Sequence, residues 1–186
     1  MVTSPPAHNL LGPLAPIRSF LLARKDVEEL SDSTVACPNP ARAPHFYALE
    51  IWPGLDPSLV RRYESATGIP IPAPYQEILT QLNGATLGDV SLYGIPPSML
   101  ETPPLLNRRR RQPLDLEAAN RHWRFEYSGC SRLFHFGGVV WSPSEIAGLF
   151  LTHDGEFEAY LRSGERVRTF DSLTALISFG LTSLEA

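Results

Sequence analysis

Four ionisable side chains in this 186-residue sequence are its best candidates for acid–base chemistry: His135, His153, Asp154 and Glu145. Each has a structural explanation that competes with catalysis. His135 alternates with Leu133 in the stretch LFHFGG, which favours a hydrogen-bonded strand residue over a general base. His153 and Asp154 flank an Asp-Gly hairpin signal, and the positive backbone angles of that turn account for the pair Asp154-Gly155. We therefore expect no catalytic residue and no enzymatic activity.

Glu145 and the polar residue Asn120 are expected to have structural roles. Glu145 closes the pattern Ser-Pro-Ser-Glu, a capping box that predicts one short helical turn before the next strand. Asn120 falls on the apolar face of a predicted helix, where a polar amide must find partners. It either fixes a neighbouring backbone segment or takes part in a ligand pocket, and we favour the first.

The sequence carries no pattern that holds a metal or a phosphate. It has no His-x-x-x-His or Cys-x-x-Cys pair, no Gly-x-Ser-x-Gly elbow and no glycine-rich phosphate loop. Its cysteines, Cys37 and Cys130, form no disulfide framework and are expected to be free thiols. We predict neither a metal nor a cofactor.

A basic run lies between Pro104 and Pro113 and consists of Arg108, Arg109, Arg110 and Arg111. Its guanidinium groups can bind phosphates or carboxylates through paired hydrogen bonds. No aromatic residues alternate with them for base stacking, and the chain has a net charge of -4, so nucleic-acid binding is not expected. The run is either a solvated loop or an ion-pairing contact with an acidic patch on a protein partner.

Two helices are predicted in the first half of the chain. Asp56 caps a helix over 57–67, with proline at its first position and Gly68 as its left-handed stop. Pro74 then opens a second helix, and Asn83-Gly84 marks its end. The apolar face of this second helix consists of Tyr75, Ile78, Leu79 and Leu82.

A strand over 90–93 follows, and the prolines at 96 and 97 end it sharply and give a rigid loop. Asp115 caps a third helix, whose apolar face consists of Leu116, Ala119 and Trp123.

The last third of the chain is predicted to be a β-meander. A two-residue turn at Asp154-Gly155 places Phe150 opposite Ala159. A three-residue loop over 163–165 places Ala159 opposite Thr169. The strand over 147–152 should be covered on both faces, and a terminal helix is its natural cover, with Leu173, Leu176 and Ile177 buried.

Residues 1–45 are expected to form an N-terminal extension, and residues 46–186 the domain proper. The extension permits a short amphipathic helix over 16–30. Prolines interrupt the apolar residues of the extension, which is not typical of a secretory signal. No apolar run in the sequence reaches the ~20 residues that span a bilayer. A cytoplasmic protein without a membrane partner is expected.

Four stretches follow one another in a characteristic order: WPGLDPSLVRRYESATGIPIP, APYQEILTQLNGATLGDVSLYGIPPSM, QPLDLEAANRHW and FHFGGVVWSPSEIAGLFLTHDGEFEAYLRSGERVRTFDSLTAL. Over roughly 52–180 this order resembles the SUKH superfamily of Smi/Knr-type domains. The resemblance implies an α+β binding domain. Many bacterial members are immunity proteins that neutralise toxins, often nucleases, and fungal members regulate cell-wall synthesis. Phe170 departs from the pattern, since a tryptophan often closes the final strand in similar sequences.

We therefore expect one α+β domain of the Smi/Knr type, with an antiparallel-rich sheet and a C-terminal meander flanked by helices. Its expected function is that of an immunity protein that blocks a cognate protein toxin by stoichiometric binding. The expected binding surface joins Tyr93, Pro96 and Met99 to Trp141 and the arginine run. The alternatives are an intracellular regulatory adaptor, and a small-ligand sensor or hydrolase with a pocket around His135 or Asn120. The oligomeric state stays open.

Overall fold

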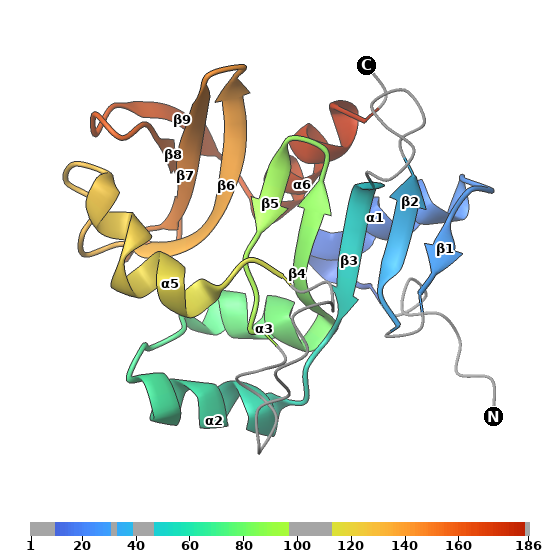
Figure 1. Cartoon of the computed structure of the whole chain (residues 1–186), viewed down its shortest axis with the longest axis horizontal. Helices are drawn as coiled ribbons and strands as arrows, with labels where there is room; N and C mark the ends of the chain where they lie inside the picture. Colours follow the sequence, from blue (N-terminus) through green and yellow to red (C-terminus); the bar gives the residue numbers. More distant parts are fainter. Residues whose placement is uncertain (1–9, 31–32, 39–46, 97–112, 185–186) are drawn as a thin grey trace.

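One antiparallel meander organises the chain (Figure 1). The computed structural model describes residues 10–30, 33–38, 47–96 and 113–184. Within them, nine strands form one open sheet in which each strand pairs with the next along the chain. The strands are β1 (Glu28–Glu29), β2 (Val35–Pro38), β3 (Tyr47–Pro53), β4 (Leu82–Leu87), β5 (Val90–Leu92), β6 (Phe134–Ser142), β7 (Glu145–Leu151), β8 (Phe157–Tyr160) and β9 (Arg166–Phe170).

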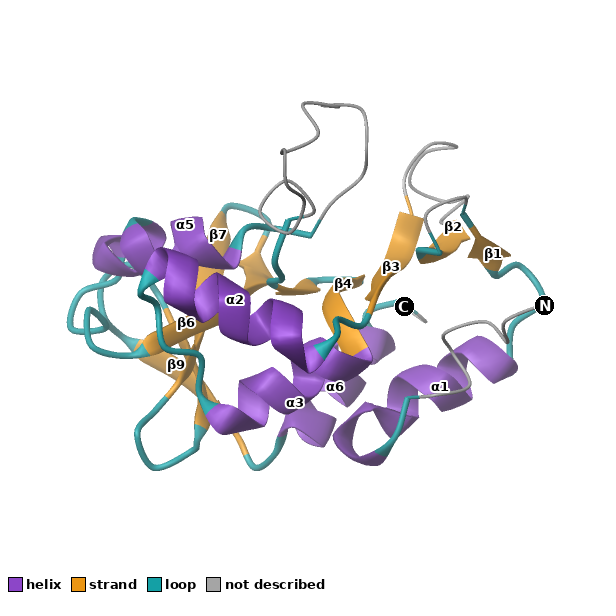
Figure 2. Cartoon of the chain, turned by 90° about the horizontal axis from the view of Figure 1, so that it is seen from below, coloured by secondary structure: helices purple, strands orange, loops and turns teal. Residues whose placement is uncertain are grey.

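Helices pack on this sheet and make the fold α+β (Figure 2). The described residues contain α1 (Ala15–Leu22), α2 (Pro57–Thr67), α3 (Ala73–Gln81), α5 (Leu116–Arg121) and α6 (Leu173–Thr182), with 3₁₀ turns η2 (Gly12–Leu14) and η3 (Trp123–Glu126). Helices α1 and α6 lie together behind strands β2 to β5 (Figure 1). Their buried residues share one core with the sheet, and the predicted burial of Leu173, Leu176 and Ile177 is confirmed.

Helix α2 has the boundaries that its sequence predicts. The Asp56 carboxylate accepts a hydrogen bond from the Ser58 N–H at 2.8 Å, and Pro57 takes the first helical position. Gly68 follows the last turn with φ 69°, a left-handed angle that glycine adopts without steric cost.

Helix α3 ends earlier than predicted. Its last residue is Gln81, the chain is already extended at Leu82, and Asn83-Gly84 lies within β4 rather than at a helix stop. The Asn83 amide explains the change, because it bonds both to the Ile95 carbonyl (2.8 Å) and to the Ile95 N–H (2.7 Å). The pair Asn-Gly therefore anchors a strand to the chain beyond β5.

The N-terminal helix is also shorter than the predicted range. Helix α1 stops at Leu22, and the chain then enters β1 and β2. Strand β2 pairs with β3, so these residues before position 46 belong to the same sheet as the rest of the fold.

The β7–β8 hairpin has a different turn from the one predicted. The loop between β7 and β8 holds three residues, because the Thr152 N–H bonds to the Glu156 carbonyl at 3.0 Å. Gly155 takes the left-handed position with φ 84°. The register consequently shifts by one residue, and Phe150 faces Glu158 instead of Ala159.

The β8–β9 hairpin has a loop of the predicted length, but the loop lies one residue earlier in the chain. The Leu161 N–H bonds to the Glu165 carbonyl at 2.9 Å, which leaves residues 162–164 as the loop, with Gly164 at φ 88°. An irregularity next to Tyr160 then places Ala159 opposite Arg168 instead of Thr169. Strand β7 is buried from Ala147 to Leu151, so its predicted cover on both faces is confirmed.

The segment around Glu145 contains no helical turn, which corrects the capping-box prediction. Ser142 pairs with Glu145 across the sheet, so the two residues between them form the tight turn of the β6–β7 hairpin. Glu145 is exposed as the first residue of β7. Strand pairing on both sides of this short turn overrides the local capping preference.

Candidate functional site

The expected binding surface is only partly on the outside of the molecule. Tyr93 is 6 % exposed, and its ring packs against Trp123 (5.6 Å between ring centroids) and His135 (5.3 Å). Pro96 is buried as well. The expectation that these two side chains present an exposed surface is therefore corrected, because both are buried. Met99 and Arg108 to Arg111 lie outside the described residues.

Trp141 belongs to an exposed apolar group at the end of the β6–β7 hairpin. Val140 is 46 %, Trp141 38 % and Ile146 56 % exposed, and Val140 faces Ile146 across the two strands. We call these three residues the hairpin patch. The register shifts between Val140 and Ser142, which leaves Trp141 as the extra residue of a bulge. Bulges of this kind re-aim a side chain at the end of a strand pair.

A glycine lies directly beside the hairpin patch. A Cβ atom at Gly138 would lie 3.0 Å from the Tyr93 hydroxyl and 3.5 Å from Cγ2 of Ile146. The Tyr93 hydroxyl and the Ile146 side chain thus border the same side of the sheet. The ring of Tyr93 is interior, but its polar end reaches the margin of the hairpin patch.

The patch has little charge of its own. Glu145 is the only acidic residue between 134 and 151, and that stretch contains no lysine or arginine. Sequence reasoning selected Trp141 but missed Val140 and Ile146, because an apolar run around glycines is typical of a strand buried on both faces. The one usable signal is the turn position of Pro143, which places its neighbours at the end of the hairpin.

Asn120 joins α5 to β6. Its amide nitrogen bonds to the carbonyls of Leu116 (3.0 Å) and His135 (2.9 Å), and its oxygen accepts the His135 N–H at 3.0 Å. The side chain is 2 % exposed, so these bonds satisfy a buried amide. Asn120 and His135 are both packed in the interior. Their burial does not favour the alternative in which they line the pocket of a small-ligand sensor.

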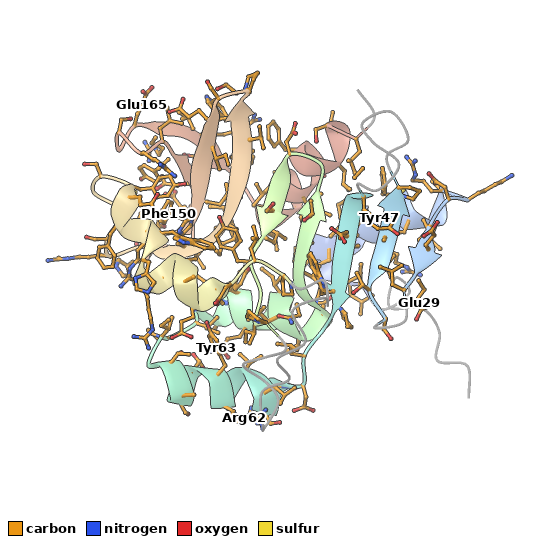
Figure 3. The ribbon with its side chains drawn as sticks, viewed as in Figure 1. Glu29, Tyr47, Arg62, Tyr63, Phe150 and Glu165 are labelled. Carbon is orange, nitrogen blue, oxygen red and sulfur yellow. The ribbon has the colours of Figure 1, made fainter. Side chains whose placement is uncertain are left out.

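His135 stacks on Phe150, its partner across β6 and β7, with 4.5 Å between ring centroids and 17° between planes. Phe150 is labelled in Figure 3, and its ring also meets that of Tyr127 edge-on. Burial lowers the pKa of His135 to about 4, and the nearby Arg124 acts in the same direction. The imidazole is therefore neutral at pH 7, and enclosure keeps it from acting as a base on an external substrate.

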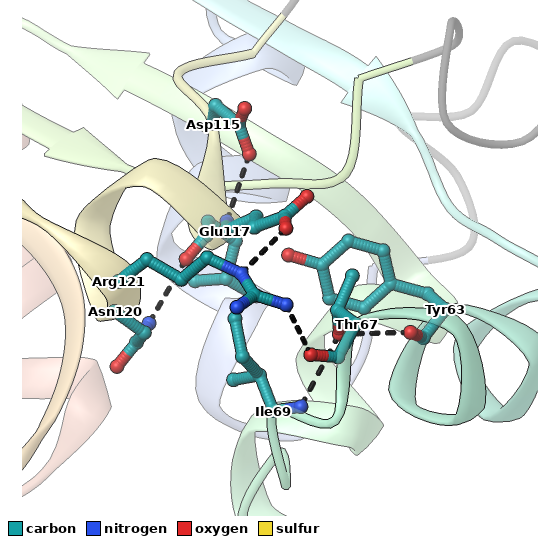
Figure 4. A network of polar contacts seen from close by, with 8 residues as sticks. Tyr63, Thr67, Ile69, Asp115, Glu117, Asn120 and Arg121 are labelled. Atoms are coloured by element: carbon teal, nitrogen blue, oxygen red, sulfur yellow. Dashed lines mark hydrogen bonds and ion pairs between the residues drawn. The ribbon is translucent and has the colours of Figure 1, made fainter.

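A polar network ties α5 to the end of α2 (Figure 4). Asp115 accepts the Glu117 N–H at 2.8 Å and so caps α5 as predicted. Arg121 pairs with Glu117 at 2.6 Å and also donates to the Thr67 carbonyl. The Tyr63 ring reaches this network from α2, but its buried hydroxyl makes no hydrogen bond.

The burial of Glu158 was not predicted from the sequence. This carboxylate accepts the Tyr160 hydroxyl at 2.6 Å and pairs with Arg166 at 2.5 Å. Tyr160 lies on β8 and Arg166 on β9, so the cluster joins the two strands of the last hairpin.

Other features of the described part of the chain do not form a reaction centre. No three histidine, cysteine or acidic residues among the described ones converge as metal ligands. A groove of about 500 Å³ runs between α2 and α3, with Val60, Arg61, Pro74 and Glu77 among its lining residues. Cys37 and Cys130 are free and buried, and burial raises the pKa of the Cys130 thiol to about 11.

None of the helices described is long and apolar enough to cross a membrane. In comparisons with protein-family models, with curated proteins and with solved structures, nothing matches this chain.

Proposed function

We propose that this chain is a non-enzymatic protein-binding domain that neutralises a cognate protein toxin by one-to-one binding. The hairpin patch is the observation that carries the proposal. Three large apolar side chains stand together at the end of one hairpin, where folding leaves them in contact with water. A cluster of this kind is typical of a surface that a partner covers.

The hairpin gives the patch the properties of a binding anchor. Its strands are buried from Phe134 to Val139 and from Ala147 to Leu151, so the exposed end extends from a fixed base. An anchored side chain loses little conformational freedom on binding, and tryptophan contributes a large contact area. Inhibition by occlusion requires these properties and no catalytic group.

The class of partner follows from charge and from the resemblance to SUKH domains. The chain has a net charge of -4, and Glu145 adds an acidic group beside the patch. These charges favour a basic partner, and a nuclease toxin is such a partner. Binding through an apolar anchor beside an acidic group fits the immunity function that the resemblance implies.

The first experiment is affinity capture of the tagged protein from its native cells, followed by purification of each candidate partner. The expected partner has a toxic activity that falls to zero at one equivalent of this chain, with a 1:1 complex by light scattering. A partner whose activity persists at saturation contradicts the proposal.

A pair of variants then tests the hairpin patch. W141S removes the bulged anchor, and we expect the affinity for the partner to fall at least 10-fold, about 1.4 kcal/mol. F125S is the matched control, because Phe125 is 59 % exposed on η3 and is not part of the hairpin patch. Equal affinities for W141S and the unmodified chain would remove the patch from the interface.

A further inference from the structure

His135 sits in an enclosed cage of aromatic rings. The side chain is 1 % exposed. It stacks on Phe150, and the rings of Tyr93 and Tyr127 meet it edge-on, each with 5.3 Å between centroids. Among the described residues, neither Nδ1 nor Nε2 has a hydrogen-bond partner. A buried polar group without a partner costs free energy, so the fold holds this imidazole at a disadvantage.

Burial outweighs the groups around the ring that favour a positive charge. The main chain of Gly137 and of Ala119 favours the charged form, but neither ring nitrogen completes a hydrogen bond of normal geometry. Arg124 of η3 is the charged side chain that acts on the ring, and it repels an imidazolium. The phenols of Tyr93 and Tyr127 stay neutral, because burial raises the pKa of both.

The cover over His135 is short and lies outside the sheet. Helix α5 has six residues, and η3 contributes no buried side chain. Asn120 ties α5 to β6 at His135 itself, through both main-chain groups of that residue. Phe150 lies on β7, which pairs with β6, whereas Tyr93 follows β5 and Tyr127 follows η3. Two main-chain hydrogen bonds of Gly94 hold the start of α5. The Gly94 N–H donates to the Leu114 carbonyl (2.9 Å), and the Gly94 carbonyl accepts from the Leu116 N–H (3.0 Å).

We propose that His135 is an acid-sensitive latch, whose protonation releases the α5–η3 cover (Leu116–Glu126) from β6 while the rest of the sheet stays folded. The start of α5 at Leu116 acts as the hinge. In the open state the imidazolium reaches water and leaves the repulsion of Arg124. The device does not depend on the proposed toxin binding.

The direction of the pH effect follows from the shift in pKa. The pKa of His135 is about 4 in the closed state against 6.5 for an exposed histidine. Closure is therefore most stable above pH 6.5, and it weakens as the pH falls from 6.5 towards 4. The equilibrium constant for opening the cover depends on the uptake of one proton by His135. With these two pKa values, it rises about 30-fold as the pH falls from 7.5 to 5.

Hydrogen exchange with mass spectrometry tests the latch on the full chain. After correction for intrinsic exchange rates, amides of the α5–η3 cover should open about 30-fold more at pH 5 than at pH 7.5. Amides of β6 and β7 should not follow. Trp123, in the cover, packs on Tyr93. In the W52F/W141F variant it is the remaining tryptophan, and its fluorescence should report the same opening of the cover.

Substitution of the ring identifies the titrating group. H135F keeps the stacked shape, loses no hydrogen bond, and should abolish the pH dependence of exchange in the cover. H122N and H153N are the controls, because both histidines are exposed, and both variants should keep the effect. A pH dependence that survives in H135F overturns the proposal.

Two further results also overturn it. One is loss of far-UV circular dichroism in step with the exchange of the cover, since that is global unfolding. The other comes from NMR of the unmodified chain, and it keeps the proposal testable even if H135F does not fold. A His135 ring that titrates near pH 6.5, with no change in exchange of the cover, contradicts the latch.

Discussion

Two buried tyrosines differ in one respect that a single-atom change can measure. The hydroxyl of Tyr75 lies 2.5 Å from the Tyr93 carbonyl and 3.1 Å from the Phe136 carbonyl, and so joins α3 to the chain at the end of β5 and to β6. The hydroxyl of Tyr63 is buried and has no hydrogen-bond partner among the residues that the structure describes. Tyrosine-to-phenylalanine substitution removes only the oxygen at each site. Y75F and Y63F should therefore change the stability of the protein in different ways.

The expected magnitudes come from the cost of breaking or burying a polar group. Y75F loses a buried hydrogen bond and leaves a main-chain acceptor under-satisfied, which should lower the free energy of unfolding by about 1.5 kcal/mol. Y63F removes an oxygen that folding has taken out of water without compensation, and should raise it by about 0.5 kcal/mol. The two rings are 0 % and 2 % exposed, so difference in burial does not explain the contrast.

Equilibrium unfolding in urea, followed by circular dichroism, measures the difference. With a slope of about 2 kcal/mol per molar urea, the midpoints of the two variants should lie about 1 M apart. A double variant checks whether the two effects add. Equal midpoints for Y75F and Y63F would refute the reasoning, and a lower midpoint for Y63F would mean that its hydroxyl has a partner in solution.

Local chemistry predicted the helices best where their caps are in the sequence. Asp56, Pro57 and Gly68 define α2, and Asp115 defines the start of α5, because each residue satisfies or terminates the backbone next to it. Asn83-Gly84 predicted a helix stop on the same logic and failed. The partner of the Asn83 amide is Ile95, and a contact across that separation is invisible to a local pattern.

The meander shows the same limit in its register. Gly155 and Gly164 marked both turns, but each takes the third place in a three-residue loop, and that one-residue difference moves every cross-strand pair. The candidate site depended on such pairs. Trp141 was found from its residue type, whereas Val140 and Ile146 became visible as a patch only when the register placed them opposite each other in water.

Three other predictions test the interior. N120A should lower the free energy of unfolding by about 3 kcal/mol, because it leaves both main-chain groups of His135 without their partner; Q81A breaks a hydrogen bond at the surface and should cost under 1 kcal/mol by the same urea assay. G148A should lower the melting temperature by several degrees, since its Cβ would lie 2.7 Å from the Phe150 ring and 2.8 Å from the Tyr127 ring, and an unchanged value would show that the rings can move. Cys37 and Cys130 should react with a thiol reagent at pH 8 only after denaturation, because burial raises the pKa of both thiols; rapid labelling of the native chain would contradict their enclosure.

The β6–β7 hairpin is built differently at its two ends, and this asymmetry is the physical basis of both proposals. Along the buried part of its strands, the absence of side chains at Gly138 and Gly148 lets the hydroxyl of Tyr93 and the ring of Tyr127 lie close against the strands. Aromatic packing there encloses His135 and fixes the hairpin. At the other end the same two strands carry apolar side chains that contact water. Folding gains nothing from apolar residues in that position, since polar residues of similar β-propensity would form the same pairs. A fixed base with an apolar, nearly uncharged end is therefore what the proposed binding of a second molecule requires.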